Sequence, residues 1–230
     1  MCGRYTLRTN LADVGNYFDV RDTIELPPRF NIAPTQDVPI VRLTKEGDAR
    51  ELAPLRWGLI PSWAKDPAVG ARNINARSET VTEKPTFRTA FRKRRCLIPA
   101  DGFFEWKPGG GKTKQPHYIC LKSEEPFAFA GLWEIWGPQS EPVHSFTIIT
   151  TEANTLLRPL HSRMPVILPQ YAHEQWLDAT NEDTKSLVEL LQPFPSREMQ
   201  HYAVSSRVNS HVNDDADCLE RVAEQKDLFG

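Results

Sequence analysis

Apolar residues in this chain recur mostly in short runs bounded by Gly, Pro, Asn and Asp, which is the pattern of β-strands rather than of long helices. The runs that predict strands cover residues 38–43, 51–59, 95–98, 102–107, 116–122, 127–133, 145–150 and 165–168. The segments between them are rich in turn residues and short enough for hairpins. The pattern therefore favours a fold built mainly from neighbouring antiparallel strands.

Helical spacing is rarer along the chain. Asn10 is placed as an N-cap before Leu11, Val14, Tyr17 and Phe18, which recur at helical intervals and predict a short first helix. Further helical patterns cover residues 84–92, 151–157, 170–177 and 182–191, the last anchored by Leu187, Leu190 and Leu191. These helices are too few to alternate with the strands, which argues against a doubly wound parallel sheet. We expect a single α+β domain over residues 1–230, β-rich and barrel-like, with a few peripheral helices.

Length and composition exclude several classes of protein. The 230 residues are 40% hydrophobic and 25% charged, which is ordinary for a globular domain and unlike a disordered chain. The longest uncharged apolar stretch, residues 126–133, is far shorter than the roughly 20 residues that a bilayer requires. The first residues, Met-Cys-Gly-Arg-Tyr, lack the basic and apolar regions of a secretory signal. We therefore expect a cytoplasmic protein, associated with the nucleoid if it is bacterial.

The charge balance restricts where a polyanion could bind. Lys and Arg number 28 and Asp and Glu 30, so the net charge of −2 gives no overall attraction to nucleic acid. A basic groove is conceivable where Arg72, Arg77, Arg88 and Arg92 lie close together in the sequence. The run 92–95, Arg-Lys-Arg-Arg, is interpreted as a solvated face when taken alone.

The four cysteines lie far apart in the sequence and form no C-x-x-C pair. They are Cys2, Cys96, Cys120 and Cys218. A zinc knuckle is therefore not expected, and in a reducing compartment we expect free thiols.

One glycine-rich stretch imitates a phosphate-binding loop. Residues 109–113, Gly-Gly-Gly-Lys-Thr, end like that motif, but position 106 is Trp106 where the motif needs glycine. A strand is predicted after the stretch instead of a helix. We interpret it as a turn-rich connector between two strands.

Cys2 is the most unusual placement in the sequence. Removal of the initiator methionine would expose an α-amine and a thiol on adjacent carbons, with pKa values of about 8 and about 8.5 in unperturbed peptides. An aldehyde condenses with such an amine to an imine, and the thiol then closes a five-membered thiazolidine ring. Taken alone, a small buried residue near a chain end remains the simpler interpretation of Cys2.

Three further residues are candidates for function. Glu105 lies between aromatic residues that would desolvate its carboxylate and favour its use in proton transfer, although an exposed strand carboxylate is an open alternative. His161 stands between a predicted helix and a strand, where a lone imidazole is more often packed or exposed than catalytic. Trp63 lies in a Pro-Ser-Trp-Ala-Lys loop, and loop aromatics near arginine suit stacking on single-stranded nucleic acid.

In combination, the motifs of this chain resemble the SRAP family, named for SOS-response-associated peptidase. Beyond the initial MCGRY, the motifs in order are NIAP (31–34), WGLIPSW (57–63), NARSE (75–79), RCLIPADGFFEW (95–106), FAGLW (129–133), FTIIT (146–150), HSRMPV (161–166) and VSSRVN (204–209). Each is weak alone, but their order over about 200 residues is specific. The resemblance implies one mixed domain around a barrel-like core, with no metal or organic cofactor.

The resemblance also implies a function: covalent capture of abasic sites in single-stranded DNA, which shields them from strand cleavage. Cys2 would form the thiazolidine with the ring-opened sugar, Asn75 would orient sugar and Cys2, Glu105 would shuttle protons, and His161 would assist opening and reversal. Phosphates would be held by Arg4, Arg77 and Arg163, and bases would meet Trp63 and Pro34. The implied enzyme is a monomer that uses imine chemistry of the lyase type. It would bind abasic single-stranded DNA, also at replication-fork junctions, and would not bind a membrane.

Two other functions stay open at this point. A thiol-dependent peptidase or autopeptidase would use Cys2 as nucleophile and His161 as base. A noncovalent single-stranded DNA binding module would bind intact and abasic DNA alike.

Overall fold

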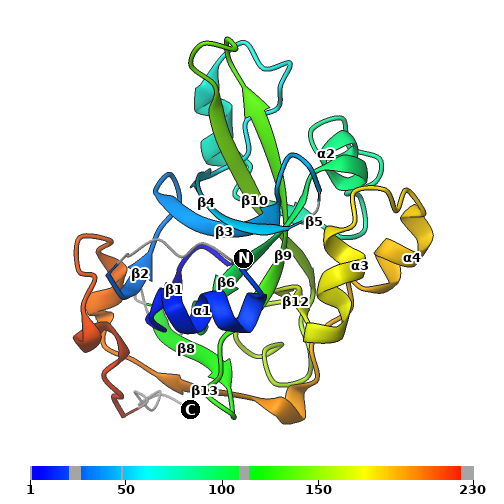
Figure 1. Cartoon of the computed structure of the whole chain (residues 1–230). Coiled ribbons are helices and arrows are strands. Elements are labelled where there is room, and N and C mark those ends of the chain that lie inside the picture. Colours follow the sequence, from blue (N-terminus) through cyan, green and yellow to red (C-terminus); the bar gives the residue numbers. More distant parts are fainter. Residues whose placement is uncertain (1, 21–26, 48, 109–113, 224–230) are drawn as a thin grey trace.

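The computed structural model describes residues 2–20, 27–47, 49–108 and 114–223 of the chain (Figure 1). Its fold confirms the expected β-rich class with a few short helices. The connector predicted at residues 109–113 lies outside the described residues.

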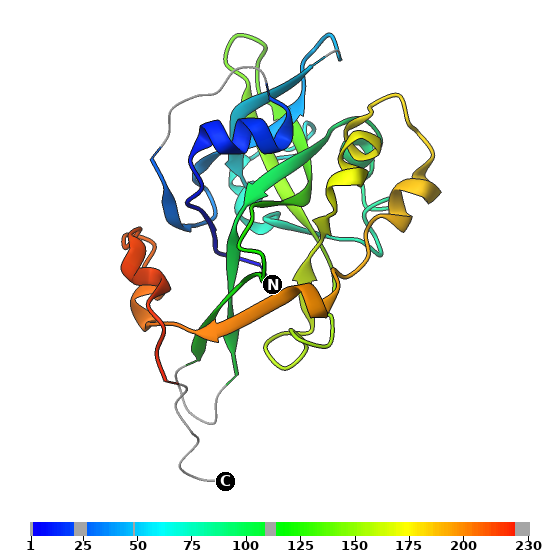
Figure 2. The same ribbon diagram turned by 60° about the horizontal axis from the view of Figure 1, so that its bottom comes forward.

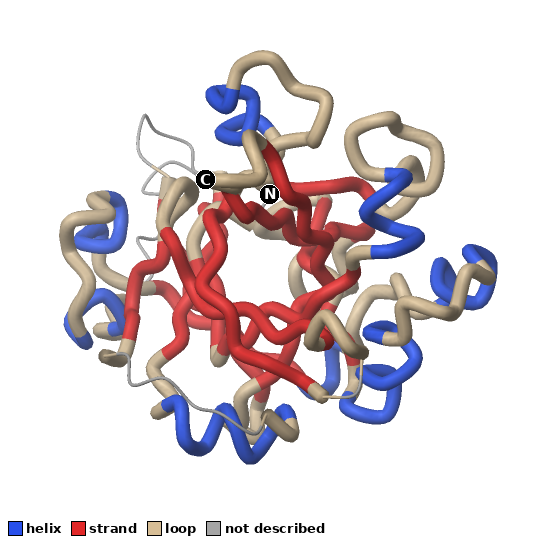
Figure 3. Tube along the Cα trace, turned by 45° about the horizontal axis from the view of Figure 1, so that its top comes forward, coloured by secondary structure: helices blue, strands red, loops and turns tan. Residues whose placement is uncertain are grey.

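Five strands close into a barrel at the centre of the molecule. They are β3 (Asp37–Leu43), β4 (Arg50–Trp57), β6 (Arg95–Ala100), β9 (Phe127–Trp136) and β10 (Val143–Glu152). The order is β10-β4-β3-β6-β9, and pairing of β9 with β10 completes the ring that Figure 3 shows in red. The β4–β10 pair is parallel and the other four pairs are antiparallel. Closure leaves these strands without free edges, as the barrel prediction required.

Three short strands extend the wall of the barrel. β5 (Asn75–Arg77) runs parallel to β10, with Asn75 opposite Ile148 and Arg77 opposite Thr150. β11 (Arg163–Pro165) pairs antiparallel with the end of β10, and β12 (Ile167–Leu168) pairs with β9. Strand β10 therefore lies between the segments around residues 75 and 163, which pair with its two edges.

A second sheet lies against the barrel, and every pair in it is antiparallel. Its order is β13 (Met199–Ala203), β8 (Gln115–Leu121), β7 (Gly102–Lys107), β1 (Tyr5–Leu7) and β2 (Arg29–Ile32). Figure 2 shows β13, in orange, beside the green strands of this sheet. Only Asp101 separates β6 of the barrel from β7, so one nearly continuous stretch of chain passes from the barrel into the sheet.

The helices are short and lie around the strands. Helix α1 (Leu11–Phe18) begins as predicted at Asn10, whose side chain accepts a hydrogen bond from the Asp13 amide. The others are α2 (Arg88–Lys93), α3 (His173–Leu177) and α4 (Thr184–Glu189), with 3₁₀ turns η1 (Pro67–Arg72), η2 (Gln170–Ala172), η3 (Ser196–Glu198), η4 (Ser206–Asn209) and η5 (Ala216–Leu219). Leu187 and Leu191 are buried, in agreement with their predicted anchoring of α4.

Two expectations from the sequence are wrong. The helix predicted at 151–157 does not form, because β10 continues to Glu152 and turns follow it. There the Asn154 side chain accepts from the amides of Leu156 and Leu157 and stabilises the turn. Arg95 is not on a solvated face but buried, with its guanidinium donating to main-chain carbonyls. Local charge could not reveal those partners, three of which lie more than 80 residues away.

The core fills the barrel and the space between it and the second sheet. It includes Trp57, Phe129 and Phe146, all completely buried, and a smaller cluster on the far face of the second sheet contains Phe104 and Tyr118. All four cysteines are buried and unbridged, as predicted. Among the described residues, no helix has the length and apolar character needed to cross a membrane.

Candidate functional site

Cys2 lies three residues before the start of β1 and is completely buried. Its sulfur makes a long contact of 4.0 Å with the Arg4 carbonyl oxygen. Burial, together with the negative charge of Glu105, raises the pKa of the Cys2 thiol to about 12. The sulfur is therefore a neutral thiol at physiological pH in this conformation.

Asn75 holds the main chain of Cys2. Its Nδ2 donates to the Cys2 carbonyl oxygen at 2.8 Å, although the two residues are 73 positions apart. Pairing of β5 with β10 fixes Asn75 opposite Ile148. The Oδ1 atom of Asn75 is buried and accepts no hydrogen bond from a described group. Because buried acceptors are nearly always satisfied, this atom is available to a polar ligand at the site.

Glu105 reaches the same place from β7. Strand β7 pairs with β1 in the second sheet, and the Phe104 amide donates to the Arg4 carbonyl at 3.0 Å. The side chain of Glu105 is 8% exposed, and its Oε1 accepts from the Trp106 amide at 3.3 Å. Its negative charge contributes to the raised pKa of the Cys2 thiol. The structure thus brings together three predicted residues, Cys2, Asn75 and Glu105, from three distant segments.

Two residues that follow Cys2 closely in sequence carry further polar groups. The hydroxyl of Tyr5 and the Nε atom of Arg4 are both buried, and neither has a hydrogen-bond partner among the described groups. Burial and the nearby Cys2 raise the pKa of Tyr5, so its hydroxyl keeps its proton. Burial also lowers the pKa of Arg4. Together with Asn75 Oδ1, these are buried polar atoms without a hydrogen-bond partner among the described groups, on residues that contact Cys2 or follow it closely in sequence.

His161 and Arg163 lie where β11 meets β10. Nδ1 of His161 accepts from the Arg163 amide at 2.9 Å, which fixes the orientation of the imidazole. The Arg163 guanidinium forms an ion pair with Glu79 at 2.5 Å and donates to Thr150. The hydrogen bond from Arg163 lowers the pKa of Glu79. A phosphate would have to compete with Glu79 for this arginine.

The other predicted DNA contacts differ in accessibility. Arg77 is exposed at the end of β5, while Arg4 is half-buried and donates to the Gly3 carbonyl at 3.1 Å. Trp63 is 63% exposed in the loop after β4. Pro34 is half-buried in the turn after β2, where the next amide, of Thr35, donates to the Trp57 carbonyl. Arg77 and Trp63 are thus the most accessible of the five.

Sequence reasoning missed Tyr5 and Thr150. Thr150 is buried, donates to the Ala76 carbonyl and accepts from Arg163, so it joins β5, β10 and β11 at the site. The sequence offered no clear signal for Thr150, because its strand contains several other polar residues. Tyr5 offered none, because a buried tyrosine usually has a partner for its hydroxyl.

No candidate metal centre is found within the described ranges, where no three His, Cys, Asp or Glu side chains gather around a common point.

Comparison with known proteins places the whole site within one family. The model of the SOS response associated peptidase (SRAP) family matches residues 1–211. The abasic site processing protein YoqW of Bacillus subtilis (strain 168) is 45% identical over 224 residues, which cover 96% of this chain and 99% of that protein. The abasic site processing protein HMCES of Xenopus tropicalis is 32% identical over 228 residues, covering 86% of this chain and 67% of that protein.

Solved structures agree with the fold. A crystal structure of a protein from Bacteroides thetaiotaomicron superposes with a TM-score of 0.87 at 27% sequence identity, and the match covers 96% of this chain and 100% of that one. A second, from Bordetella bronchiseptica, gives a TM-score of 0.76 at 30% identity, covering 89% of this chain and 100% of that chain.

Proposed function

The chain belongs to the SOS response associated peptidase (SRAP) family, and we propose that it processes abasic sites in DNA by capturing them covalently through Cys2. The substrate is the ring-opened deoxyribose of an abasic site in single-stranded DNA. The product is a thiazolidine that links the sugar to the first residue of the mature protein and protects the strand from cleavage.

One observation carries this proposal: three segments that are far apart in sequence meet at Cys2. Asn75 binds its carbonyl at 2.8 Å, and the charge of Glu105 acts on its sulfur. Arg4 and Tyr5, which follow Cys2 closely in sequence, and Asn75, which contacts it, each have a buried polar atom without a hydrogen-bond partner among the described groups. A purely structural cysteine needs none of these groups, whereas a reacting sugar offers hydroxyl and carbonyl oxygens to satisfy them.

The first step joins the amine to the sugar. Removal of Met1 turns the Cys2 nitrogen into an α-amine with a pKa of about 8, so that a fraction is neutral and nucleophilic near pH 7. This nitrogen adds to the aldehyde carbon, and the carbinolamine then loses water to give an imine. Glu105 is placed to donate the proton that the leaving oxygen needs. Asn75 holds the carbonyl of the same residue and so limits the directions in which the amine can point.

The second step closes the ring. The Cys2 sulfur adds to the imine carbon, a C–S bond forms, and the thiol proton passes to the ring nitrogen. Because the thiol is neutral in this site, its proton must be removed as the bond forms, and the Glu105 carboxylate is the nearby base. His161 would assist opening of the sugar and reversal of the adduct. The two steps consume one aldehyde, one amine and one thiol and release one water.

DNA would approach over the accessible predicted contacts. Arg77 offers an exposed guanidinium for a phosphate, and Trp63 an exposed ring for a base. Arg4 and Arg163 would hold phosphates nearer the sugar. We propose a monomer that binds single-stranded DNA, also at replication-fork junctions, in the cytoplasm.

The peptidase alternative is less well supported. A cysteine peptidase needs a thiolate, which neighbouring groups stabilise by lowering the thiol pKa. Here burial and Glu105 raise the pKa of Cys2 to about 12. A noncovalent binding module would not need the set of polar groups at Cys2.

The test is incubation of the protein with an oligonucleotide that carries one abasic site. We expect an adduct that resists denaturation, with a mass equal to the sum of both molecules less one water. The Cys2→Ala variant keeps the amine but lacks sulfur, so its adduct should be an imine that survives only after borohydride reduction. Cys96→Ala, a buried cysteine of the barrel, is the control and should react like the native protein.

Intact mass of the protein before reaction decides the first requirement. A preparation that retains Met1 should form no adduct until an aminopeptidase removes it. An equally durable adduct from Cys2→Ala without borohydride would contradict ring closure through sulfur. Turnover of a peptide library that depends on Cys2 would favour the peptidase instead.

A further inference from the structure

Glu105 shares one face of the second sheet with two histidines. It lies directly opposite His117 in the β7–β8 pair, and in the β8–β13 pair His201 lies opposite Ile119. Side chains two apart on a strand point the same way, so Glu105, His117 and His201 form a row across three strands. This face belongs to the main core, which contains Phe103 and Ile119, while residues of the other parity pack in the separate cluster of Phe104 and Tyr118.

The members of the row are close enough to interact. Directly opposite residues in an antiparallel pair have Cβ atoms about 5 Å apart, which brings the Glu105 carboxylate within reach of the His117 ring. Nδ1 of His117 and Nδ1 of His201 are 3.1 Å apart, and the two rings meet edge to face with centroids 5.1 Å apart. A hydrogen bond therefore joins His117 to His201, and strand pairing places Glu105 next to His117.

Burial changes along the row. Glu105 is 8% exposed and His117 is fully buried, whereas His201 is half-buried and reaches solvent. Two ring nitrogens at hydrogen-bond distance require one to donate and the other to accept, so the pair holds one proton between them. An imidazole can take a proton at one nitrogen and release another from its second nitrogen. The arrangement therefore has the chemistry of a path between a buried carboxylate and water.

We propose that His117 and His201 relay protons between Glu105 and solvent during the capture of the abasic sugar. The inference rests on the proposed function and specifies how its proton balance is met. An α-amine with a pKa of about 8 is mostly protonated near pH 7, and it must lose one proton before it attacks the aldehyde. That proton passes to Glu105. The O–H bond of Glu105 then breaks as an N–H bond forms on His117, the proton on the second nitrogen of His117 moves to His201, and His201 releases one to water.

Replacement of the outer histidine tests the relay. The His201→Ala variant removes a half-buried ring, so the fold should persist, and a time course of adduct formation with an abasic oligonucleotide should show a rate lower by about tenfold. Imidazole added to the buffer should restore the rate, because it can occupy the space and carry the proton. A merely structural role for His201 would not respond to imidazole.

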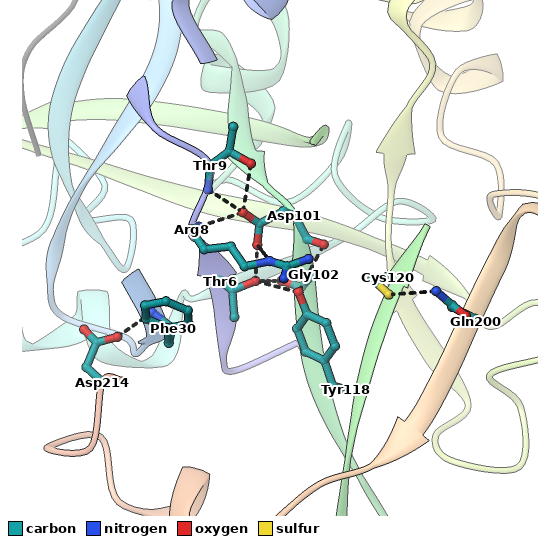
Figure 4. Close-up of polar contacts among 10 residues, drawn as sticks. All are labelled: Thr6, Arg8, Thr9, Phe30, Asp101, Gly102, Tyr118, Cys120, Gln200 and Asp214. Atoms are coloured by element: carbon teal, nitrogen blue, oxygen red, sulfur yellow. Dashed lines mark hydrogen bonds and ion pairs between the residues drawn. The ribbon is translucent and has the colours of Figure 1, made fainter. Parts of the chain in front are cut away.

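Gln200→Ala is the matched control. Gln200 is the preceding residue on β13 and points to the opposite face, where its amide nitrogen contacts the Cys120 sulfur at 3.7 Å (Figure 4). This variant should react at the native rate. His117→Gln should slow the reaction as much as His201→Ala, and the double variant should be no slower than either alone, because both changes interrupt one path.

The outcomes separate the two proposals. A native rate for His201→Ala, or a loss that imidazole does not restore, would overturn the relay while the adduct itself still supports the function. If native protein that has lost Met1 forms no adduct, the proposed function is overturned, and the relay proposal, which rests on it, falls as well.

Discussion

At the scale of single residues, one buried carboxylate ties the start of the chain to the junction between barrel and sheet. Asp101 is 1% exposed and accepts hydrogen bonds from the amides of Arg8 and Thr9 at 2.6 and 2.9 Å, and from the hydroxyl of Thr6 (Figure 4). Thr6 also shares a hydrogen bond with the Tyr118 hydroxyl. Since β1 begins three residues after Cys2, Asp101 helps to hold the start of the chain in place.

We expect Asp101→Asn to lower the free energy of unfolding by about 2–4 kcal/mol, because the amide keeps one acceptor oxygen but puts N–H groups toward buried donors. Denaturant titration measures the loss. Asp66→Asn is the control, since Asp66 caps an exposed 3₁₀ turn through the Ala68 amide and asparagine caps as well. Equal effects of the two substitutions would contradict the special role of Asp101.

At the scale of elements, short helices depend on groups outside themselves. Helices α2 and α3 have six and five residues, too few to be stable alone. Arg95 of β6 donates to carbonyls at their C-terminal ends, those of Phe91 and Arg92 at 2.7 and 2.6 Å and that of Trp176 at 2.6 Å. Burial lowers the pKa of the Arg95 guanidinium to about 10, so it stays charged at neutral pH, where a cation stabilises the helix ends.

Arg95→Met should therefore cost about 3–5 kcal/mol of stability, because several buried carbonyls lose their donor at once. Arg95→Lys should recover only part of the loss, since a single ammonium cannot match the planar fork of arginine. Thermal unfolding of both variants beside Arg92→Met, a change at an exposed position, measures the difference. If Arg95→Met unfolds at the same temperature as Arg92→Met, Arg95 does not hold these helices in place.

At the scale of the whole molecule, the net charge of −2 leaves DNA binding to a few local arginines. Arg77 is exposed, while Arg163 is held by Glu79. If DNA binds as proposed, its affinity comes from a small number of phosphate contacts and should depend only modestly on salt.

With three or four phosphate contacts, the logarithm of the association constant should fall against the logarithm of salt concentration with a slope of about −2 to −3. Arg77→Ala should make this slope shallower by about 0.7, as the loss of one contact requires. Fluorescence anisotropy with an intact single-stranded oligonucleotide measures both slopes. Arg207→Ala, at an exposed arginine paired with Asp215, should leave the slope unchanged, and an equal change there would refute the assignment of Arg77.

The strands show how far local pattern reaches. The sequence predicted β7 of the second sheet, β3 of the barrel and the main length of the other four barrel strands. Each of these strands has enough apolar positions to show a strand pattern. It missed β1, β2, β5 and β13, which have three to five residues each. Such short strands exist because a longer neighbour pairs with them, so their own residues carry little signal. Two of them, β1 and β5, position the candidate site.

The sequence by itself determined the β-rich class, the first helix with its Asn10 cap, and the order of motifs that indicates the family. Only the tertiary structure decided that Asn75 binds Cys2, that polar atoms of Arg4 and Tyr5 stay unsatisfied beside it, and that His117 and His201 follow Glu105 in a row. Periodicity reports which face of an element is buried, because it depends on neighbours along the chain. Partners across a closed barrel and a crossing sheet are set by strand pairing between distant segments, and no local pattern records that pairing.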